Sequence, residues 1–250
     1  MNINEGLLYG YGLFESIKIE HNKPLLLQQH FARMQQAATA LTIYFAYDFA
    51  QFHHLVTQEI NQVALETFVL RCSLIKDKDK SYLVFSSRPF RYTKEMYQQG
   101  FKLTLSKIKR NEYSNLVAYK TLNYLDNLLE LKKAKIQGFN EVLFLNTQEI
   151  LTEGATSNLF LVKNNIIHTP SSTCGLLKGV MRQRVLDQCL ALNLHTKEGC
   201  YDLNFILSCD EIFITNAVMG IMSVVSLNNH KYEDRHMANK LKLALNIMKK

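Results

Sequence analysis

Three features near the middle of the chain could together perform amine chemistry. Lys120, in the stretch Tyr119-Lys120-Thr121, carries a primary amine that can form an imine with an aldehyde. Glu153 carries a carboxylate that can pair with a ring nitrogen. Residues 175–182 read Gly-Leu-Leu-Lys-Gly-Val-Met-Arg and lead into an expected helix, whose free N–H groups can bind a phosphate. A lysine, an acid and a helix start of these kinds predict a site for pyridoxal phosphate (PLP).

The setting of Lys120 distinguishes it from the other lysines of the chain. Most lysines are solvated surface side chains, because lysine is almost never fully buried. Lys120 instead stands between Tyr119 and an apolar group made by Leu122, Tyr124 and Leu125. An amine in such a pocket could act as a nucleophile or as a base. In a PLP enzyme this lysine first holds the aldehyde and then moves the proton at the reacting carbon.

Other polar residues could close around a cofactor. Thr156 and Ser157 place hydroxyl groups just after Gly154 and Glu153, which suits the close approach of a ligand and suits an ordinary turn equally well. Arg33, on an expected helix, could make a bidentate phosphate contact or could be a surface arginine. These residues support the PLP hypothesis only in combination.

The remaining patterns exclude several other functions. The eight histidines show no HxH or HExxH spacing, so no metal site is expected. No GxSxG, Walker A or GxGxxG pattern occurs. The formal charge of +7 is scattered, and one of the two densest basic runs is interleaved with aspartates, so nucleic acid is not an expected partner. An anionic small molecule fits the charge as well.

Cysteine usage and hydropathy indicate a compartment. The five cysteines are an odd number without CxxC spacing, which argues against a disulfide scaffold and for a reducing environment. No stretch is apolar over a sufficient length to span a bilayer, and the N-terminus lacks a basic segment followed by an apolar run. We therefore expect a cytoplasmic protein with no membrane partner.

Hydrophobic periodicity predicts strands and helices in irregular alternation, as in an α/β (α+β) fold of two domains with a cleft between them. Because the segment 111–119 is polar and irregular, we expect a small N-terminal α/β domain at 1–112 and a larger PLP-binding domain at 113–250. The expected helices are 28–41, 48–62 with Asp48 as N-cap, 125–137, 180–192 and 239–248, and the main strands are 13–20, 68–74, 82–87, 101–108, 141–146, 157–163 and 211–216.

Together these motifs resemble the class IV, or fold type IV, PLP-dependent enzymes. That family contains branched-chain aminotransferases, D-amino acid aminotransferases and 4-amino-4-deoxychorismate lyases. The resemblance runs from Tyr-Gly-Tyr-Gly-Leu-Phe-Glu at 9–15 to Asn-Ala-Val-Met at 216–219. It implies a two-domain fold like that of D-amino acid aminotransferase, with PLP in the interdomain cleft. It also implies a homodimer in which the partner helps to complete each site.

The resemblance assigns a role to each motif residue. Lys120 resembles the catalytic lysine that binds PLP, Glu153 the partner of the pyridine nitrogen, and Arg33 the phosphate-binding arginine of an H-x-x-R segment. The other cofactor-binding residues expected are Tyr124, Thr156, Ser157, Val180, Met181, Asn216 and Ala217, and the expected substrate-pocket residues are Tyr9 and Phe14.

Within the family, segments 179–183 and 215–219 look most like the lyases. Aminotransferases more often carry threonine where Met181 stands and hydroxyl residues where Asn216 and Ala217 stand. The departures concern the substrate side: Lys76-Asp77 replaces the usual Arg-Gly pair, and the first strand of the family is missing or shortened. The expected activity is conversion of 4-amino-4-deoxychorismate to 4-aminobenzoate and pyruvate. The alternative is an aminotransferase acting on branched-chain or D-amino acids with a 2-keto acid.

A protein of a different class, a non-catalytic or regulatory module on the same scaffold, would also match the fold. The joint presence of Lys120, Glu153 and Arg33 counts against it, because a binding module has no need for an imine-forming lysine.

Overall fold

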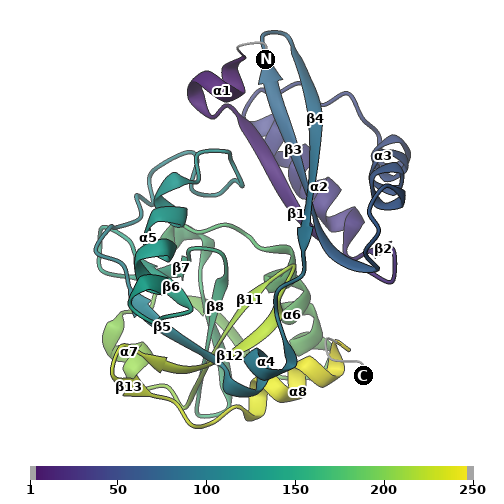
Figure 1. Ribbon diagram of the computed structural model, residues 1–250. Helices are drawn as coiled ribbons and strands as arrows, with labels where there is room; N and C mark the ends of the chain where they lie inside the picture. The colour runs from purple at the N-terminus through teal and green to yellow at the C-terminus, as the bar shows by residue number, and fades with distance from the viewer. Residues whose placement is uncertain (1–3, 247–250) are drawn as a thin grey trace. The chain divides into compact units, whose positions relative to one another are not determined.

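The computed structural model describes residues 4–246 and divides the chain into two compact units (Figure 1). The first unit ends at Arg91 and also contains the segment Tyr119–Tyr124. The second unit comprises Tyr92–Ala118 and the chain from Leu125 onward. The sequence placed one boundary at residue 112, whereas the chain leaves the first unit after Arg91 and returns to it briefly.

The first unit is an antiparallel four-stranded sheet with two longer helices. The strand order is β2-β1-β3-β4, and β1 pairs with β3 along its whole length, from Gly12 opposite Ile75 to Glu20 opposite Thr67. The elements are α1 (Glu5–Tyr9), β1 (Gly12–Glu20), β2 (Lys23–Pro24), α2 (Leu27–Ala40), α3 (Phe49–Asn61), β3 (Thr67–Asp77) and β4 (Lys80–Pro89).

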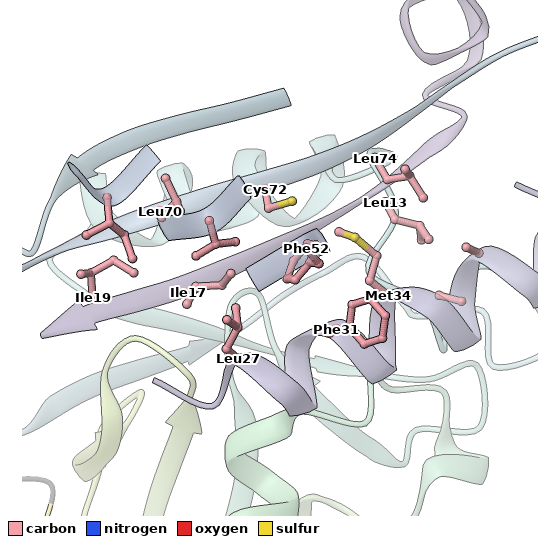
Figure 2. Packing of buried hydrophobic residues seen from close by; sticks show 14 of the residues in the cluster. Leu13, Ile17, Ile19, Leu27, Phe31, Met34, Phe52, Leu70, Cys72 and Leu74 are labelled. Atoms are coloured by element: carbon pink, nitrogen blue, oxygen red, sulfur yellow. The ribbon is translucent and has the colours of Figure 1, made fainter. Parts of the chain in front are cut away.

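The core of this unit follows from the strand period of two. Alternate residues of β1 and β3 point to the same side of the sheet, where α2 and α3 cover them (Figure 2). Phe31 of α2 packs against Phe52 of α3 with ring centroids 5.4 Å apart. Asp48 starts α3 with a capping box shared with Gln51, which confirms the expected N-cap. The β1 and β3 residues of this core are Leu13, Ile17, Ile19, Phe68, Leu70, Cys72 and Leu74.

The second unit is built on a nine-stranded sheet that closes on itself. Strands β8, β11, β12, β5, β6 and β7 pair in succession, and β7 pairs again with β8, so that six strands form a ring. Only Glu153 opposite Asn158 closes the β7–β8 pair. The strands are β5 (Phe101–Leu105), β6 (Glu141–Leu145), β7 (Leu151–Gly154), β8 (Asn158–Lys163), β9 (Ile166–Pro170), β10 (Thr196–Gly199), β11 (Glu211–Asn216), β12 (Gly220–Leu227) and β13 (His230–Lys231).

Alternate side chains along the ring strands belong to two different hydrophobic clusters. Ile212 and Ile214 of β11 join a cluster that draws on all six ring strands, whereas Phe213 lies in a second cluster with residues of α6 and α8. These two helices lie along the outside of β11 and β12 (Figure 1). The helices of this unit are α4 (Lys94–Gln99), α5 (Leu125–Ile136), η1 (Ser172–Cys174), α6 (Val180–Ala191), α7 (Leu203–Leu207) and α8 (His236–Ala244).

The last expected helix, 239–248, begins earlier than predicted, at His236, and its residues 247 and 248 lie outside the described part of the chain. Within residues 4–246, no helix has the length and apolar content needed to cross a bilayer.

Candidate active site

The segment containing Lys120 lies along the edge of β1. The Phe14 backbone N–H donates to the Lys120 carbonyl oxygen at 2.8 Å, and the Leu122 N–H donates to the Gly12 carbonyl at 2.9 Å. Thr121 forms a β-bridge with Leu13 between these two bonds. A lysine in an otherwise irregular connection is therefore fixed by sheet hydrogen bonds, which explains why Tyr119–Tyr124 belongs to the first unit.

Two aromatic rings hold the Lys120 amine. The Lys120 Nζ lies 4.3 Å from the centroid of the Phe14 ring and 5.2 Å from that of Tyr124. The two rings contact each other edge to face, with centroids 5.1 Å apart. Aromatic faces attract an ammonium group, so this arrangement positions the amine. The structure thus brings together three residues that the sequence proposed separately.

Arg71 of β3 joins this group and was not anticipated from the sequence. Its guanidinium carbon lies 3.7 Å from the centroid of the Phe14 ring. Burial lowers the pKa of Arg71, against an opposing effect of Tyr124. Its alternation with the core residues of β3 places it on the sheet face opposite α2. A half-buried arginine on the same aromatic ring as the lysine offers an anion-binding group, and only the cross-strand register could have revealed it.

Arg33 of α2 belongs to a buried polar cluster centred on Glu15, which lies on the face of β1 opposite to Phe14. Its Nε and Nη2 atoms donate to the two oxygens of Glu15 at 2.8 and 2.5 Å. His30 Nδ1 lies 2.6 Å from Glu15 Oε2. Burial would raise the pKa of Glu15, but the charges and hydrogen bonds of Arg33 and His30 outweigh burial and lower it to about 2. Glu15 therefore fixes the orientation of the Arg33 guanidinium.

The same cluster determines the tautomer of His30. Burial lowers the pKa of His30, against the raising effect of Glu15. Since an ionised carboxylate only accepts hydrogen bonds, His30 must donate from Nδ1. Its Nε2 atom is buried and has no hydrogen-bond partner in the described part of the chain.

Glu153, in the second unit, is held from three directions. Its Oε2 accepts from the side-chain amide of Asn158 at 3.1 Å and from the Leu177 backbone N–H at 3.2 Å. Arg110 Nη2 lies 3.8 Å from Glu153 Oε1. Arg110 in turn donates to Asn127 at 2.9 Å. Arg110 is a second charged residue that sequence reasoning missed, because 43 residues separate it from Glu153.

The turn after Glu153 is organised by a buried acid, Glu141. Thr156 donates to Glu141 Oε2 from its hydroxyl at 2.6 Å and from its backbone N–H at 3.1 Å, and the Ser157 hydroxyl donates to the same oxygen at 3.2 Å. Burial raises the pKa of Glu141, against these hydrogen bonds. Both hydroxyls therefore stabilise the turn itself.

Asn216 links this turn to the end of β11. Its side-chain amide donates to the Thr156 carbonyl at 3.1 Å. Its Oδ1 accepts from the backbone N–H groups of Val218 and Met219 at 3.0 and 2.7 Å. Ala217 is half-buried in the corner that these bonds close.

The start of α6 has the properties of an anion site. Gly179 is its N-cap and provides no side-chain cap, so the first amide groups of the helix lack intrahelical acceptors. A Cβ atom at Gly179 would lie 2.0 Å from Asn158 Oδ1, which requires glycine there. Val180 and Met181, the expected phosphate-binding pair, are the first two residues of this helix.

Tyr9 ends α1 and is 68% exposed. In residues 4–246 no three His, Cys, Asp or Glu side chains gather into a possible metal site.

A family model decides the relationship of this chain to known proteins. The model for class IV amino-transferases matches residues 12–227. The chain belongs to this family. Its members are PLP-dependent enzymes, so the expected enzyme class, cofactor and family are confirmed.

Individual relatives differ in activity. The aminodeoxychorismate lyase of Bacillus subtilis is 26% identical over 92% of this chain and 82% of its own length. The D-alanine aminotransferase of Bacillus licheniformis is 24% identical over 90% of this chain and 82% of its own length. The solved 4-amino-4-deoxychorismate lyase of Pseudomonas aeruginosa is 25% identical, with a TM-score of 0.90 over 99% of this chain and 94% of its own. The expected fold type IV architecture is confirmed.

The residues of the second unit fit PLP. Its groups include an uncapped helix start at a glycine that cannot carry a side chain, and a carboxylate whose position is fixed by Asn158 and Leu177. Arg110 adds a positive charge 3.8 Å from the Glu153 carboxylate, and its Nε is buried without a hydrogen-bond partner among the described residues.

The Glu15 cluster predicts a pH dependence of stability. Because folding lowers the pKa of Glu15 from 4.5 to about 2, its contribution is complete above pH 4.5 and is lost as the pH falls toward 2. The shift corresponds to roughly 3 kcal/mol. We expect Glu15→Gln to be less stable near neutral pH, and its free energy of unfolding to fall less between pH 4.5 and 2, in urea titrations.

Glu66→Gln is the matched control, since Glu66 is an exposed carboxylate of the same unit. It should reproduce the pH profile of the unmodified protein. Parallel profiles for the unmodified protein and Glu15→Gln would contradict the assigned role of Glu15.

Proposed function

We propose that the chain is a lyase that converts 4-amino-4-deoxychorismate to 4-aminobenzoate and pyruvate. The observation that carries this proposal is the Asn216 corner. One side chain both donates to the Thr156 carbonyl and accepts from two backbone N–H groups. A hydroxyl side chain, as aminotransferases more often have there, would have to make all three bonds from a single oxygen atom, whereas the Asn216 amide donates from Nδ2 and accepts at Oδ1, two separate atoms on a longer side chain. The similarity to lyases of B. subtilis and P. aeruginosa supports it further.

Lys120 is the proposed catalytic residue and covalent attachment point. When bound, PLP supplies an electron sink for the substrate carbon that carries the amine. The Lys120 amine, held against Phe14 and Tyr124, removes the proton from that carbon and returns a proton to the departing pyruvate. Aromatisation of the product supplies the driving force of the elimination. The protein therefore has to provide only orientation and one group that carries the proton from the ring carbon to the departing pyruvate.

The remaining proposed roles concern binding. Glu153 pairs with the pyridine nitrogen and keeps it protonated. Arg33, aimed by Glu15, and the first amides of α6 neutralise the phosphate. The proposed cofactor contacts are Lys120, Glu153, Arg33, Tyr124, Thr156, Ser157, Val180, Met181, Asn216 and Ala217.

The substrate carries two carboxylates, which fit the basic charge of the chain. Arg71 is the group of the first unit best suited to one of them, because burial lowers the solvation that would compete for its charge. Phe14 and Tyr9 are the proposed lining residues for the ring. The alternative, an aminotransferase for branched-chain or D-amino acids, would use Lys120 and Glu153 in the same roles, as the similarity to D-alanine aminotransferase suggests.

We also propose a cytoplasmic homodimer. Helix α5 presents an apolar stripe with Leu125 66%, Leu128 53%, Leu129 44% and Ile136 77% exposed. An apolar stripe of this kind on a helix indicates a protein contact surface. The five free cysteines fit a reducing compartment.

The lyase proposal is tested with the PLP-loaded protein and 4-amino-4-deoxychorismate. We expect 4-aminobenzoate and pyruvate to form in equal amounts. In parallel, branched-chain L-amino acids and D-alanine with 2-oxoglutarate should yield no amino-group transfer. Transfer without 4-aminobenzoate would make the aminotransferase the correct activity. Inactivity toward both sets would contradict both proposals.

Lys120→Ala should lose turnover by at least about 10²–10⁴-fold, the range attributable to proton transfer alone. It should also lose the cofactor absorbance that covalent attachment produces. Lys240→Ala, which removes an exposed lysine of α8, is the control and should retain both. Substantial turnover in Lys120→Ala would show that another group carries the proton.

The dimer proposal predicts that Leu128→Glu shifts the protein toward monomer in sedimentation velocity, because a charge would be buried in the contact. Leu190→Glu makes the same change at an apolar residue of α6 that is 79% exposed, and should leave the assembly unchanged. A monomeric unmodified protein, or an equal effect of both variants, would count against the α5 surface.

A further inference from the structure

Two cysteine thiols of the second unit lie in contact. The Sγ atoms of Cys174 and Cys200 are 3.4 Å apart. Cys174 ends the short helix η1, and Cys200 directly follows β10. Neither residue takes part in the function proposed above.

The backbone explains why the two thiols meet. Strands β9 and β10 run parallel, with Pro170 opposite Gly199, so both chains leave the sheet at the same end. The Ser171 N–H donates to the Gly199 carbonyl at 2.9 Å and continues the contact past the strand ends. The Cys174 N–H then donates to the Ser171 carbonyl at 3.0 Å, which turns Cys174 back toward Cys200.

The two thiols differ in their access to solvent. Cys200 is exposed, whereas Cys174 is 2% exposed. Burial, with a further contribution from the contact with Cys200, raises the pKa of Cys174 to about 12. Cys72, Cys189 and Cys209 are also buried. A dissolved reagent therefore meets Cys200 first and finds Cys174 directly behind it.

We propose that Cys174 and Cys200 form a thiol modification site that takes a small-molecule disulfide of the glutathione type and closes a reversible intramolecular disulfide. An exposed attacking thiol and a second thiol within van der Waals contact are the two parts that such a site requires. Closing the bond needs the sulfurs to approach by about 1.4 Å, from 3.4 Å to the usual S–S length of about 2.0 Å.

The reaction proceeds in two exchanges. The Cys200 thiolate attacks one sulfur of the oxidant, the oxidant S–S bond breaks, and one glutathione thiolate leaves and takes up a proton. Cys174 then loses its proton to solvent and attacks the Cys200 sulfur, which releases the second glutathione. The protein loses two hydrogen atoms, and the oxidant is reduced to two thiols.

The new bond would join segments that are already fixed. The Cys174 carbonyl accepts from the Asn146 side-chain amide at 3.2 Å, and Leu177, three residues later, donates to Glu153. The bond would therefore tie the chain leading to α6 without displacing Glu153. Because it closes a loop between residues 174 and 200 that is otherwise open in the unfolded chain, we expect oxidation to raise the unfolding temperature.

The test treats the PLP-loaded protein with oxidised glutathione and follows its intact mass. We expect a transient gain of one glutathione followed by a net loss of about 2 Da, and a peptide map that joins Cys174 to Cys200. Dithiothreitol should restore the starting mass.

Two variants and a control sharpen the test. Cys174→Ser should stop at the stable mixed disulfide on Cys200, and Cys200→Ser should remain unmodified. Cys209→Ser, which removes a buried cysteine outside the pair, should react like the protein with the original sequence. The proposal would be overturned by a mixed disulfide that persists in the protein with the original sequence. It would also be overturned by the absence of any reaction, or by a peptide map that joins another pair of cysteines.

Discussion

The pairing of residues 120–122 with the edge of β1 is the constraint on which the candidate site depends. Two backbone hydrogen bonds and one isolated β-bridge fix an otherwise irregular connection against the edge of the first unit's sheet. Because the bond to Phe14 is made by the Lys120 carbonyl itself, the lysine and the ring that holds its amine are fixed by one interaction. The alternation of β1 then sends Phe14 toward Lys120 and Glu15 toward Arg33, so one strand orients groups on both of its faces.

Buried acids organise the polar groups around this arrangement. Glu15 fixes Arg33, Glu141 fixes the turn at Thr156, and Glu153 is itself held by Asn158 and the backbone of Leu177. Each acid satisfies the N–H and O–H groups that folding removes from water, and none of the three relies on a surface ion pair of small energetic value. Orientation of charged groups thus comes from hydrogen bonding inside each unit.

Local patterns predicted much of the fold, because alternation and capping are encoded by neighbouring residues. The strand at 13–20 and the N-cap at Asp48 agree with the structure closely. Short strands such as β7 and β10, and the closed ring, depend on pairing between distant segments and left no local signal. The same limit applies to the site: the sequence indicated Lys120 and Phe14, whereas the cross-strand partner Arg71 and the buried acid Glu141 became recognisable only through their contacts. The return of residues 119–124 to the first unit escaped prediction for the same reason.

The closure of the six-strand ring at a single residue pair has a mechanical consequence. Glu153 and Asn158 form the seam of the barrel, joined there through their backbones and by the Asn158 side chain. The β7–β8 pair has fewer paired residues than the other strand pairs of the ring, so local opening of the ring is expected there first. Any such opening would move the Glu153 carboxylate. A molecule bound at once by Glu153 and by the start of α6 would hold the β7–β8 pair closed. Occupancy and the rigidity of the barrel would then rise together, since whatever binds only the closed ring stabilises it.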